Sequence, residues 1–333
     1  MRFTVPARRA LRHALLLCSC GMLAAVPVLR AQHDALAQLH AALDAGEADH
    51  ALAVLRALPQ SGENNAEAQN LACRVHYSLQ QWDAAENSCE KAIRLDRNNA
   101  NNHLWLGRAL GEKAGHASFL SAYSLGKRAR SEFEQAVHLN PHNVDALTDL
   151  GEFYEEAPSV VGGGYDKAEQ IAQQLDHLDP AHAHQLRARI AEAQKDYGTA
   201  EREYKAAIAV SAHPALHWTT LASFFRRRKR WQDLDWAIHN TCNAAKSDKH
   251  ATVALYDGAG VLTEANRNTD LAVRMLETYL TSDSKTEEGP AFEAHLRLAK
   301  LKKSMGDRAG AENERSAALA LAHDYKPAQE AKF

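Results

Sequence analysis

Residues 132–167, which read EFEQAVHLNPHNVDALTDLGEFYEEAPSVVGGGYDK, decide the fold. Phe133, Ala136 and Leu139 recur at helical spacing, and Pro141 follows just beyond them. Proline cannot continue a helix, because it lacks the N–H that the helix needs and its ring clashes with the preceding turn. The first half of the stretch is therefore predicted to be the end of one amphipathic helix.

The second half of the stretch predicts a new helix. Leu147, Leu150, Gly151 and Tyr154 fall at positions i, i+3, i+4 and i+7, which is one face of a helix. A small residue there lets two antiparallel helices approach closely. This order of a Leu-Gly pair, an aromatic residue one turn later and then an Ala-Phe-Ala-Pro series resembles the tetratricopeptide family. That resemblance implies helical hairpins stacked into a right-handed α-solenoid.

The same period extends over nearly the whole chain. The chain has 333 residues, 45% of them hydrophobic, with only 17 glycines and 9 prolines, and no alternating Val/Ile/Thr runs that would predict a sheet. An all-α solenoid of about eight tetratricopeptide-like hairpins is therefore predicted over residues 32–321, followed by a polar C-terminal tail, 322–333. The predicted hairpins are 32–65, 66–99, 100–143, 144–182, 183–213, 214–250, 251–289 and 290–321.

Two insertions interrupt the repeats. Residues 112–127 add about ten residues that are apolar enough for an extended helix or a packed loop. Residues 157–164 form a bulge in which Pro158 stops a helix and three glycines supply a turn with positive φ. The bulge lacks the spacing of a phosphate-binding loop and follows a helix, which excludes that motif. A partner contact is hypothesised at Gly162, Gly163, Gly164 and Tyr165.

Residues 1–31 have the layout of a secretory signal peptide, with a basic end, a short apolar core and a small residue before the expected cleavage site. A retained membrane anchor is less favoured because the apolar run is short. A lipoprotein signal around Cys18 and Cys20 is also less favoured. The sequence thus predicts an exported protein, periplasmic or secreted, with no membrane span after cleavage.

Charge and cysteine content narrow the function further. The whole chain has a formal net charge of −3, and the first 31 residues contain five arginines and no acid, so the mature chain is more acidic. Such a chain does not resemble a general nucleic-acid binder. Cys73 and Cys89 occupy inward positions on the two helices of one predicted hairpin. A bridge between them is one interpretation, and two small buried hydrophobic residues is the favoured one. Cys242 is the third cysteine of the expected mature chain.

The family resemblance implies a concave groove lined by the first helix of each hairpin, which binds an extended peptide or a partner helix. Asn70, Arg74 and Arg108 match the family's carboxylate clamp only loosely, because its lysines are missing. The groove candidates that the resemblance places at outward positions are Asn70, Arg74, Tyr77, Asn101, Leu104, Arg108, Glu112, Asp145, Thr148 and Glu152, followed by His184, Arg187, Thr219, Ser223 and Arg226.

Other patterns do not indicate a reaction. The basic run Arg226–Arg230 is interpreted as the solvated end of a helix rather than an anion patch. The histidines His177, His182 and His184 lack the spacing of a metal motif, so no metal is predicted. No nucleophile motif or catalytic residue is found, and no cofactor is expected.

The sequence therefore predicts a non-enzymatic, exported scaffold that mediates protein–protein interaction. Its partner is a protein or a peptide, not a nucleic acid. One alternative is a structural component of a cell-envelope assembly that binds through the two insertions. A less favoured one is an accessory subunit of an envelope enzyme. The sequence specifies neither the partner nor the oligomeric state.

Overall fold

A computed structural model describes residues 33–58 and 64–333, and within these ranges the chain is helical and contains no strand. The predicted signal peptide lies outside the described residues. The all-α solenoid is confirmed, and its helices pair into the eight expected hairpins. In order, the helices are residues 33–45 and α2 (Ala48–Ala57); α4 (Ala66–Ser78) and α5 (Trp82–Leu95); α6 (Ala100–Gly115) and α7 (Phe119–Leu139); α8 (Val144–Glu156) and α9 (Tyr165–Leu175); α10 (Pro180–Ala193) and α11 (Tyr197–Val210); α12 (Pro214–Arg227) and α13 (Trp231–Ser247); α14 (Val253–Glu264) and α15 (Thr269–Thr281); α16 (Ala291–Ser304) and α17 (Arg308–Leu321).

Capping residues set where several first helices begin. The Asn65 side chain accepts a hydrogen bond from the Ala68 amide at 3.0 Å, and Asn143 caps α8 in the same way at 3.1 Å. Asp179 accepts from two amides at the start of α10. Each cap satisfies a backbone donor that the first helical turn leaves unpaired. Hydrogen bonds between residues close in sequence therefore fix where these repeats begin.

Small residues let neighbouring helices approach, within a hairpin at Gly107 and between hairpins at Gly151. A Cβ added to Gly151 would lie 2.4 Å from Leu186 Cδ2, and one added to Gly107 would lie 2.6 Å from the Phe133 ring. Such distances are well inside van der Waals contact, so a larger residue would push neighbouring helices apart.

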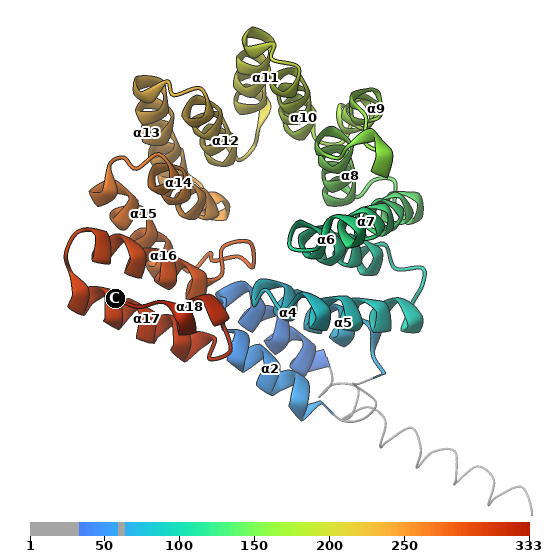
Figure 1. Cartoon of the computed structure of the whole chain (residues 1–333), viewed down its shortest axis with the longest axis horizontal. Helices are drawn as coiled ribbons and strands as arrows, with labels where there is room; N and C mark the ends of the chain where they lie inside the picture. The colour runs from blue at the N-terminus through green and yellow to red at the C-terminus, as the bar shows by residue number, and fades with distance from the viewer. Residues whose placement is uncertain (1–32, 59–63) are drawn as a thin grey trace, which may run out of the picture.

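The solenoid closes on itself. In Figure 1 the helices follow a ring, and the last hairpin, drawn in red, returns to lie beside the first two, drawn in blue. One hydrophobic cluster joins Leu39 and Leu71 of the first hairpins to Phe292 and Tyr325 near the C-terminus. We call this junction the seam: residues 33–58 and 64–79 against 287–333. The last hairpin therefore covers the face of the first hairpin that the end of an open solenoid leaves in water.

The C-terminal segment belongs to the seam. Residues 322–333, predicted as a polar tail, contain the short helix α18 (Lys326–Glu330) and the buried side chains Ala322, Tyr325 and Ala328. The His323 amide donates to Asp49 Oδ2 at 2.9 Å, and Gln80 Nε2 donates to the Tyr325 hydroxyl at 3.4 Å. These bonds add polar contacts around an apolar junction.

A disulfide links the two helices of the second hairpin. Cys73 on α4 and Cys89 on α5 are bonded, with 5.2 Å between their Cα atoms, and both side chains are fully buried. The favoured prediction, two unlinked small hydrophobic residues, is therefore wrong. Facing inward positions on antiparallel helices bring the two Cβ atoms within bridging distance.

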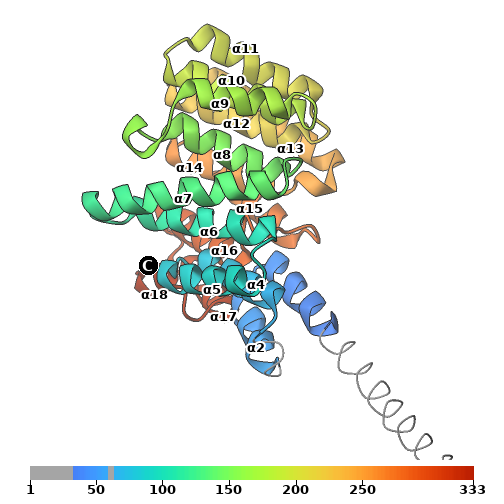
Figure 2. The same cartoon turned by 90° about the vertical axis from the view of Figure 1, so that its right-hand side faces the viewer.

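The insertions extend helices and reshape one turn. The first lengthens α6 and α7, and Figure 2 shows α7 projecting beyond its neighbours. In the second, the 3-10 helix η1 (Ser159–Val161) precedes Gly162, whose φ is +103°. The expected turn with positive φ is present, and of the three glycines only Gly162 adopts the left-handed conformation. Gly163 is needed instead for close approach, because a Cβ there would lie 1.7 Å from the Ala157 carbonyl oxygen.

The basic run joins neighbouring hairpins. Arg226 pairs with Glu264 at 2.8 Å, and Arg227 binds both carboxylate oxygens of Glu192 at 2.7 Å. Arg230 pairs with Glu201 and Asp233. The interpretation of this run as merely solvated is thus too simple, because a two-point pair connects hairpin six to hairpin five and a single ion pair connects it to hairpin seven.

Lys195 gives a stability prediction. It lies in the turn between α10 and α11 with φ +65°, and its side chain is exposed. A left-handed conformation costs a non-glycine residue about 1–2 kcal/mol, and glycine avoids this cost but gains freedom in the unfolded chain. Lys195→Gly is expected to raise the free energy of unfolding by about 0.5–1 kcal/mol, measured by urea titration. Lys195→Ala, which keeps the strain, should bring no gain. An equal gain in both variants would contradict this explanation.

Candidate functional site

A pocket of about 920 Å³ lies at the seam. Its walls come from α4, α6 and α8, from the start of α7, from η1, and from residues 287–293 before and within α16. In Figure 1 the first helices of the hairpins lie nearer the centre of the ring than the second helices, so these walls belong to its inner side. The lining residues are Arg74, Tyr77, Ser78, Gln80, Trp82, Trp105, Arg108, Gly111, Glu112, Ala114, Phe119, Ala122, Tyr123, Gly126, Phe133, Asp149, Glu152, Phe153, Glu156, Ala157, Pro158, Val160, Val161, Glu287, Glu288, Pro290 and Glu293.

Trp105 organises the floor of the pocket. The guanidinium carbons of Arg74 and Arg108 lie 5.1 Å and 4.6 Å from the centre of its ring, and Tyr77 contacts it edge-on at 5.5 Å. Arginine is attracted to the face of an indole and loses less hydration than lysine would. The two cations are therefore held in fixed positions by one aromatic side chain.

Both arginines are also paired with carboxylates. Arg74 donates to the two oxygens of Glu287 at 2.8 and 2.6 Å, across a sequence separation of 213 residues. Arg108 donates to Asp149 at 2.5 and 3.3 Å. Two-point pairing fixes orientation as well as charge. One of these pairs crosses the seam, so ring closure and the shape of the pocket are linked.

The pocket raises the pKa of several of its acids. Burial raises the pKa of the Asp149 carboxyl, and the nearby Arg108 guanidinium only partly opposes this effect. The pKa of Glu152 rises chiefly through burial, against the opposing charge of Arg189. For Glu288, which water still reaches, the surrounding walls and the charge of Glu287 raise the pKa, whereas Arg108 lowers it. Burial and neighbouring negative charges destabilise the ionised form of a carboxylate, so its pKa rises.

The structure places only part of the predicted groove in this pocket. Of the ten principal candidates, Arg74, Tyr77, Arg108, Glu112 and Glu152 line it. Asn101 and Asp145 are exposed outside its lining, and Thr148 is half-buried. Of the bulge candidates, Tyr165 is exposed, Gly163 is buried and Gly162 and Gly164 are half-buried; none lines the pocket.

Three candidates at predicted outward positions are buried instead. Leu104 is 2% exposed and packs in the hydrophobic core. Asn70 is 7% exposed and donates to the Asn101 carbonyl oxygen at 3.3 Å, so it joins two hairpins. Thr219 is also buried and bonds to the backbone of α12 and α14. Inward curvature brings the first helices of adjacent hairpins together, and this covers positions that a flat array would expose.

Sequence reasoning missed the acids on the far side of the pocket. Glu287 and Glu288 lie in the connection between the last two hairpins, and nothing local marks them as neighbours of Arg74. Asp149 had a detectable signal, since it lies one helical turn after Asp145. Phe119, Tyr123 and Val160 were within the predicted insertions, whose contribution to the same pocket was not predicted.

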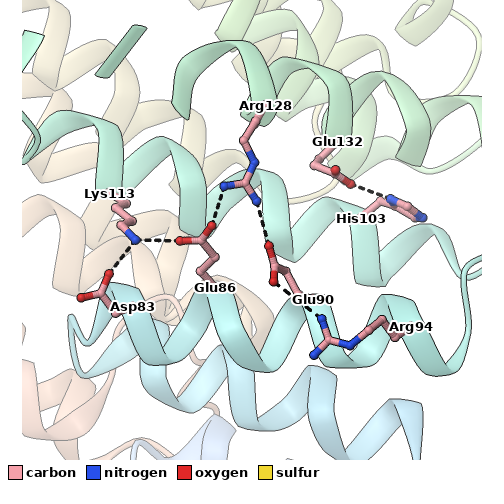
Figure 3. A network of polar contacts seen from close by, with 8 residues as sticks. All are labelled: Asp83, Glu86, Glu90, Arg94, His103, Lys113, Arg128 and Glu132. Atoms are coloured by element: carbon pink, nitrogen blue, oxygen red, sulfur yellow. Dashed lines mark hydrogen bonds and ion pairs between the residues drawn. The ribbon is translucent and has the colours of Figure 1, made fainter. Parts of the chain in front are cut away.

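An ion-pair network supports the inserted region. As Figure 3 shows, Glu86 on α5 accepts from Lys113 on α6 at 2.7 Å and from Arg128 on α7 at 2.6 Å. Arg128 also donates to Glu90 at 2.9 Å. Burial raises the pKa of Glu86, but its bonds to Lys113 and Arg128 outweigh that effect and lower it overall. The network ties three helices together behind the pocket.

His103 gives a pH prediction. Its ring nitrogens face two acceptors, Glu132 Oε2 at 2.7 Å and the Arg97 carbonyl oxygen at 3.0 Å, so only the protonated ring donates to both. Burial lowers the pKa of His103, but these bonds raise it overall. The folded state thus retains the His103 proton to higher pH than the unfolded chain. Protonated His103 therefore stabilises the fold fully below about pH 6.5, and this stabilisation is lost as pH rises through the folded pKa.

Between about pH 5.5 and pH 8.5, we expect the free energy of unfolding of the wild type to fall by about 1 kcal/mol relative to that of His103→Gln. Urea titrations of both proteins at the two pH values measure this difference. A difference that is constant with pH, or that has the opposite sign, would contradict the assignment.

The histidines near residue 180 are paired singly with acids. His182 lies 2.9 Å from Asp179, whereas His184 bonds to Glu203 at 2.7 Å. Across the part of the chain that the structure describes, no group of three or more His, Cys, Asp or Glu residues is arranged to hold a metal ion. Across the same residues, no helix has the length and apolar character needed to cross a membrane.

Comparison with known proteins gives similarity in fold only. No protein-family model matches the chain, and no curated protein matches it. Two crystal structures of MamA are similar to it. The first has 21% sequence identity and a TM-score of 0.39, and covers 49% of this chain and 88% of MamA. The second has 20% identity and a TM-score of 0.38, and covers 52% and 91%. TM-scores this low carry no functional argument, so the tetratricopeptide resemblance depends on the repeat pattern and the hairpins themselves.

Proposed function

We propose that this protein is an exported scaffold that binds a segment of a protein partner in the seam pocket. The observation that carries the proposal is the pocket itself, about 920 Å³ in volume and lined by seven aromatic side chains among fixed charges. This volume is at the upper end of the range of ligand-binding clefts, and aromatic residues are enriched where proteins bind one another. The extended, peptide-like form of the ligand is part of the proposal.

The disulfide supports export. Disulfides persist in oxidising compartments such as the periplasm or the extracellular space, and are rare in the cytosol. The Cys73–Cys89 bond lies in the core and is not exposed to reductants. Together with the signal-peptide pattern of residues 1–31, it favours a periplasmic or secreted protein.

Site-specific photocrosslinking tests the proposal. Phe119, which lines the pocket and is 85% exposed, is replaced by the photoreactive analogue p-benzoylphenylalanine in cells that produce the protein. The matched control is the same replacement at Val210, which is 52% exposed and lies outside the pocket. A partner captured from position 119 and not from position 210 is expected. Capture of no protein from position 119, or of the same species from both positions, would refute the proposal.

The second candidate, a structural component of an envelope assembly, is favoured by one feature. Leu120 is 80% exposed on the projecting end of α7 but does not line the pocket. Exposed large apolar side chains on insertions are typical of contact surfaces. If assembly is the function, crosslinking from position 120 should succeed and crosslinking from Glu112, within the pocket, should fail.

A further inference from the structure

Carboxylates predominate in the lining of the seam pocket. Seven carboxylates and two guanidinium groups are among its lining residues, and two arginines outside the lining, Arg189 and Arg297, pair with three of these acids, Glu152, Glu156 and Glu293. Both guanidinium groups are already paired, Arg74 with Glu287 and Arg108 with Asp149. The pocket therefore offers negative charge and no unpaired positive charge to an incoming ligand. This arrangement disfavours an acidic segment or a terminal carboxylate, because neither finds an unpaired cation.

Two of the acids face the pocket without a partner. Across residues 33–58 and 64–333, neither Glu112 nor Glu288 has an ion pair or a side-chain hydrogen bond. Both are exposed to solvent, and they lie on α6 and on the connection before α16, which both line the pocket. A cationic side chain that pairs with either carboxylate would offset the repulsion from the surrounding acids.

An apolar surface adjoins the acids. Phe119 and Val160 are 85% and 66% exposed, and Tyr123 is 39% exposed. All three line the pocket, and all belong to the two insertions that depart from the repeat. Large apolar side chains left in water at the edge of a pocket gain free energy when a ligand covers them. The insertions thus add an apolar wall to an acidic pocket.

We propose that the seam pocket recognises a partner segment in which aromatic or aliphatic side chains stand next to lysine or arginine. The apolar side chains pack against Phe119, Tyr123 and Val160, and the cationic side chains pair with Glu112 and Glu288. This inference depends on the proposed scaffold function and names the chemistry of its partner. It follows from charge complementarity and from the placement of the insertions, not from the repeats.

Fluorescence anisotropy with designed peptides tests this specificity on the purified protein. The first labelled peptide carries phenylalanine residues followed by lysines. In the second, every lysine is glutamate, and in the third, every phenylalanine is serine. The lysine peptide should bind at least about tenfold more tightly than either of the others, and its affinity should fall as salt rises.

Matched variants locate the binding site. Glu112→Gln combined with Glu288→Gln should weaken the lysine peptide by about tenfold, and Phe119→Ser should do so by a similar factor. Glu330→Gln and Val210→Ser, which remove an exposed acid and an exposed apolar residue outside the pocket, should change affinity by less than about twofold. Circular dichroism checks that every variant remains folded. Each substituted side chain is exposed, so the fold is expected to tolerate the change.

Two results would overturn the inference. One is equal affinity for the lysine and glutamate peptides. The other is a loss of binding in Glu330→Gln as large as that in the pocket variants, which would indicate diffuse attraction to an acidic surface. Crosslinking distinguishes failure of this inference from failure of the proposed scaffold function. If position 119 captures a partner through an acidic segment, the scaffold function stands and the inferred chemistry is wrong; if it captures nothing, the scaffold function fails.

Discussion

Replacing both Cys73 and Cys89 with alanine should lower the free energy of unfolding by about 3 kcal/mol. The bond closes a loop with a sequence separation of 16 residues, and a crosslink of that span restricts the unfolded chain by about this amount. Alanine is used because both positions are fully buried and a serine hydroxyl would need a hydrogen-bond partner there. The measurement is a urea titration followed by circular dichroism.

A second measurement distinguishes the effect of losing the bond from the effect of losing two buried sulfur atoms. Reductant present throughout the urea titration reaches the bond once the chain unfolds, so it should destabilise the wild type by a similar amount and leave the double variant unchanged. Cys242→Ala, which removes a half-buried cysteine outside the bond, should cost less than about 1 kcal/mol. If the reductant has no effect on the wild type, the bond does not stabilise the fold.

The disulfide also bears on the site. Cys73 precedes Arg74 on α4, and Tyr77 follows one turn later, so the bonded hairpin carries part of the pocket wall. Fixing α4 to α5 holds these two side chains against Trp105. Loss of the bond is therefore expected to weaken ligand binding as well as folding, because ordering of the wall would then be required on binding.

The sequence predicts the hairpins well because their boundaries depend on nearby residues. Asn65, Asn143 and Asp179 cap helices within three residues, and Gly107 and Gly151 control contacts between adjacent helices. Signals of this kind lie within one repeat. They explain why an all-α solenoid and its eight units are recognisable without a structure.

Ring closure is not predictable in the same way. The rotation between successive hairpins is small, and whether the ends meet depends on its sum over all eight. Leu39 and Phe292 look like ordinary core residues in the sequence, and nothing indicates that they share one cluster. For the same reason, the sequence does not indicate that Glu287 pairs with Arg74. The half of the pocket that depends on closure was therefore missed, whereas five groove candidates on α4, α6 and α8 lie in the pocket lining.

Curvature explains the wrong groove assignments too. Leu104 and Asn70 occupy outward positions on isolated helices, yet both are covered by neighbouring helices in the ring. The helical periodicity of a single repeat cannot distinguish a solvent-facing position from one that the next repeat covers. The positions that remain accessible, such as Arg108 and Glu112, lie nearer the C-terminal end of α6, beside the insertion.

Gly46→Ala should open the ring. Gly46 has a φ of +70°, and a Cβ there would lie 2.1 Å from the Ala291 amide nitrogen, which belongs to the backbone on the other side of the seam. Gly306 is the matched control, since its φ is +87° but a Cβ there would meet nothing within 4 Å. Both alanines cost about 1–2 kcal/mol of backbone strain, and only Gly46→Ala must also displace α16.

Distance measurements between the two sides read out the seam directly. Spin labels are attached at exposed His50 and Asp324 in a Cys242→Ala background. Gly46→Ala should lengthen and broaden the distance distribution and lower the free energy of unfolding by about 2–4 kcal/mol, whereas Gly306→Ala should leave the distances unchanged and cost about 1–2 kcal/mol. The same distances in both variants would show that the seam tolerates the added methyl group.

The ring and the pocket should then fail together. Arg74 lies on one side of the seam and Glu287 on the other, and their ion pair holds the pocket wall in place. A ligand that contacts both sides binds the closed ring more tightly than an open one, and it can shift the equilibrium only by that difference in affinity. Gly46→Ala is therefore expected to weaken binding of the lysine peptide more than Gly306→Ala does, and saturating peptide should restore part of the short distance between the labels.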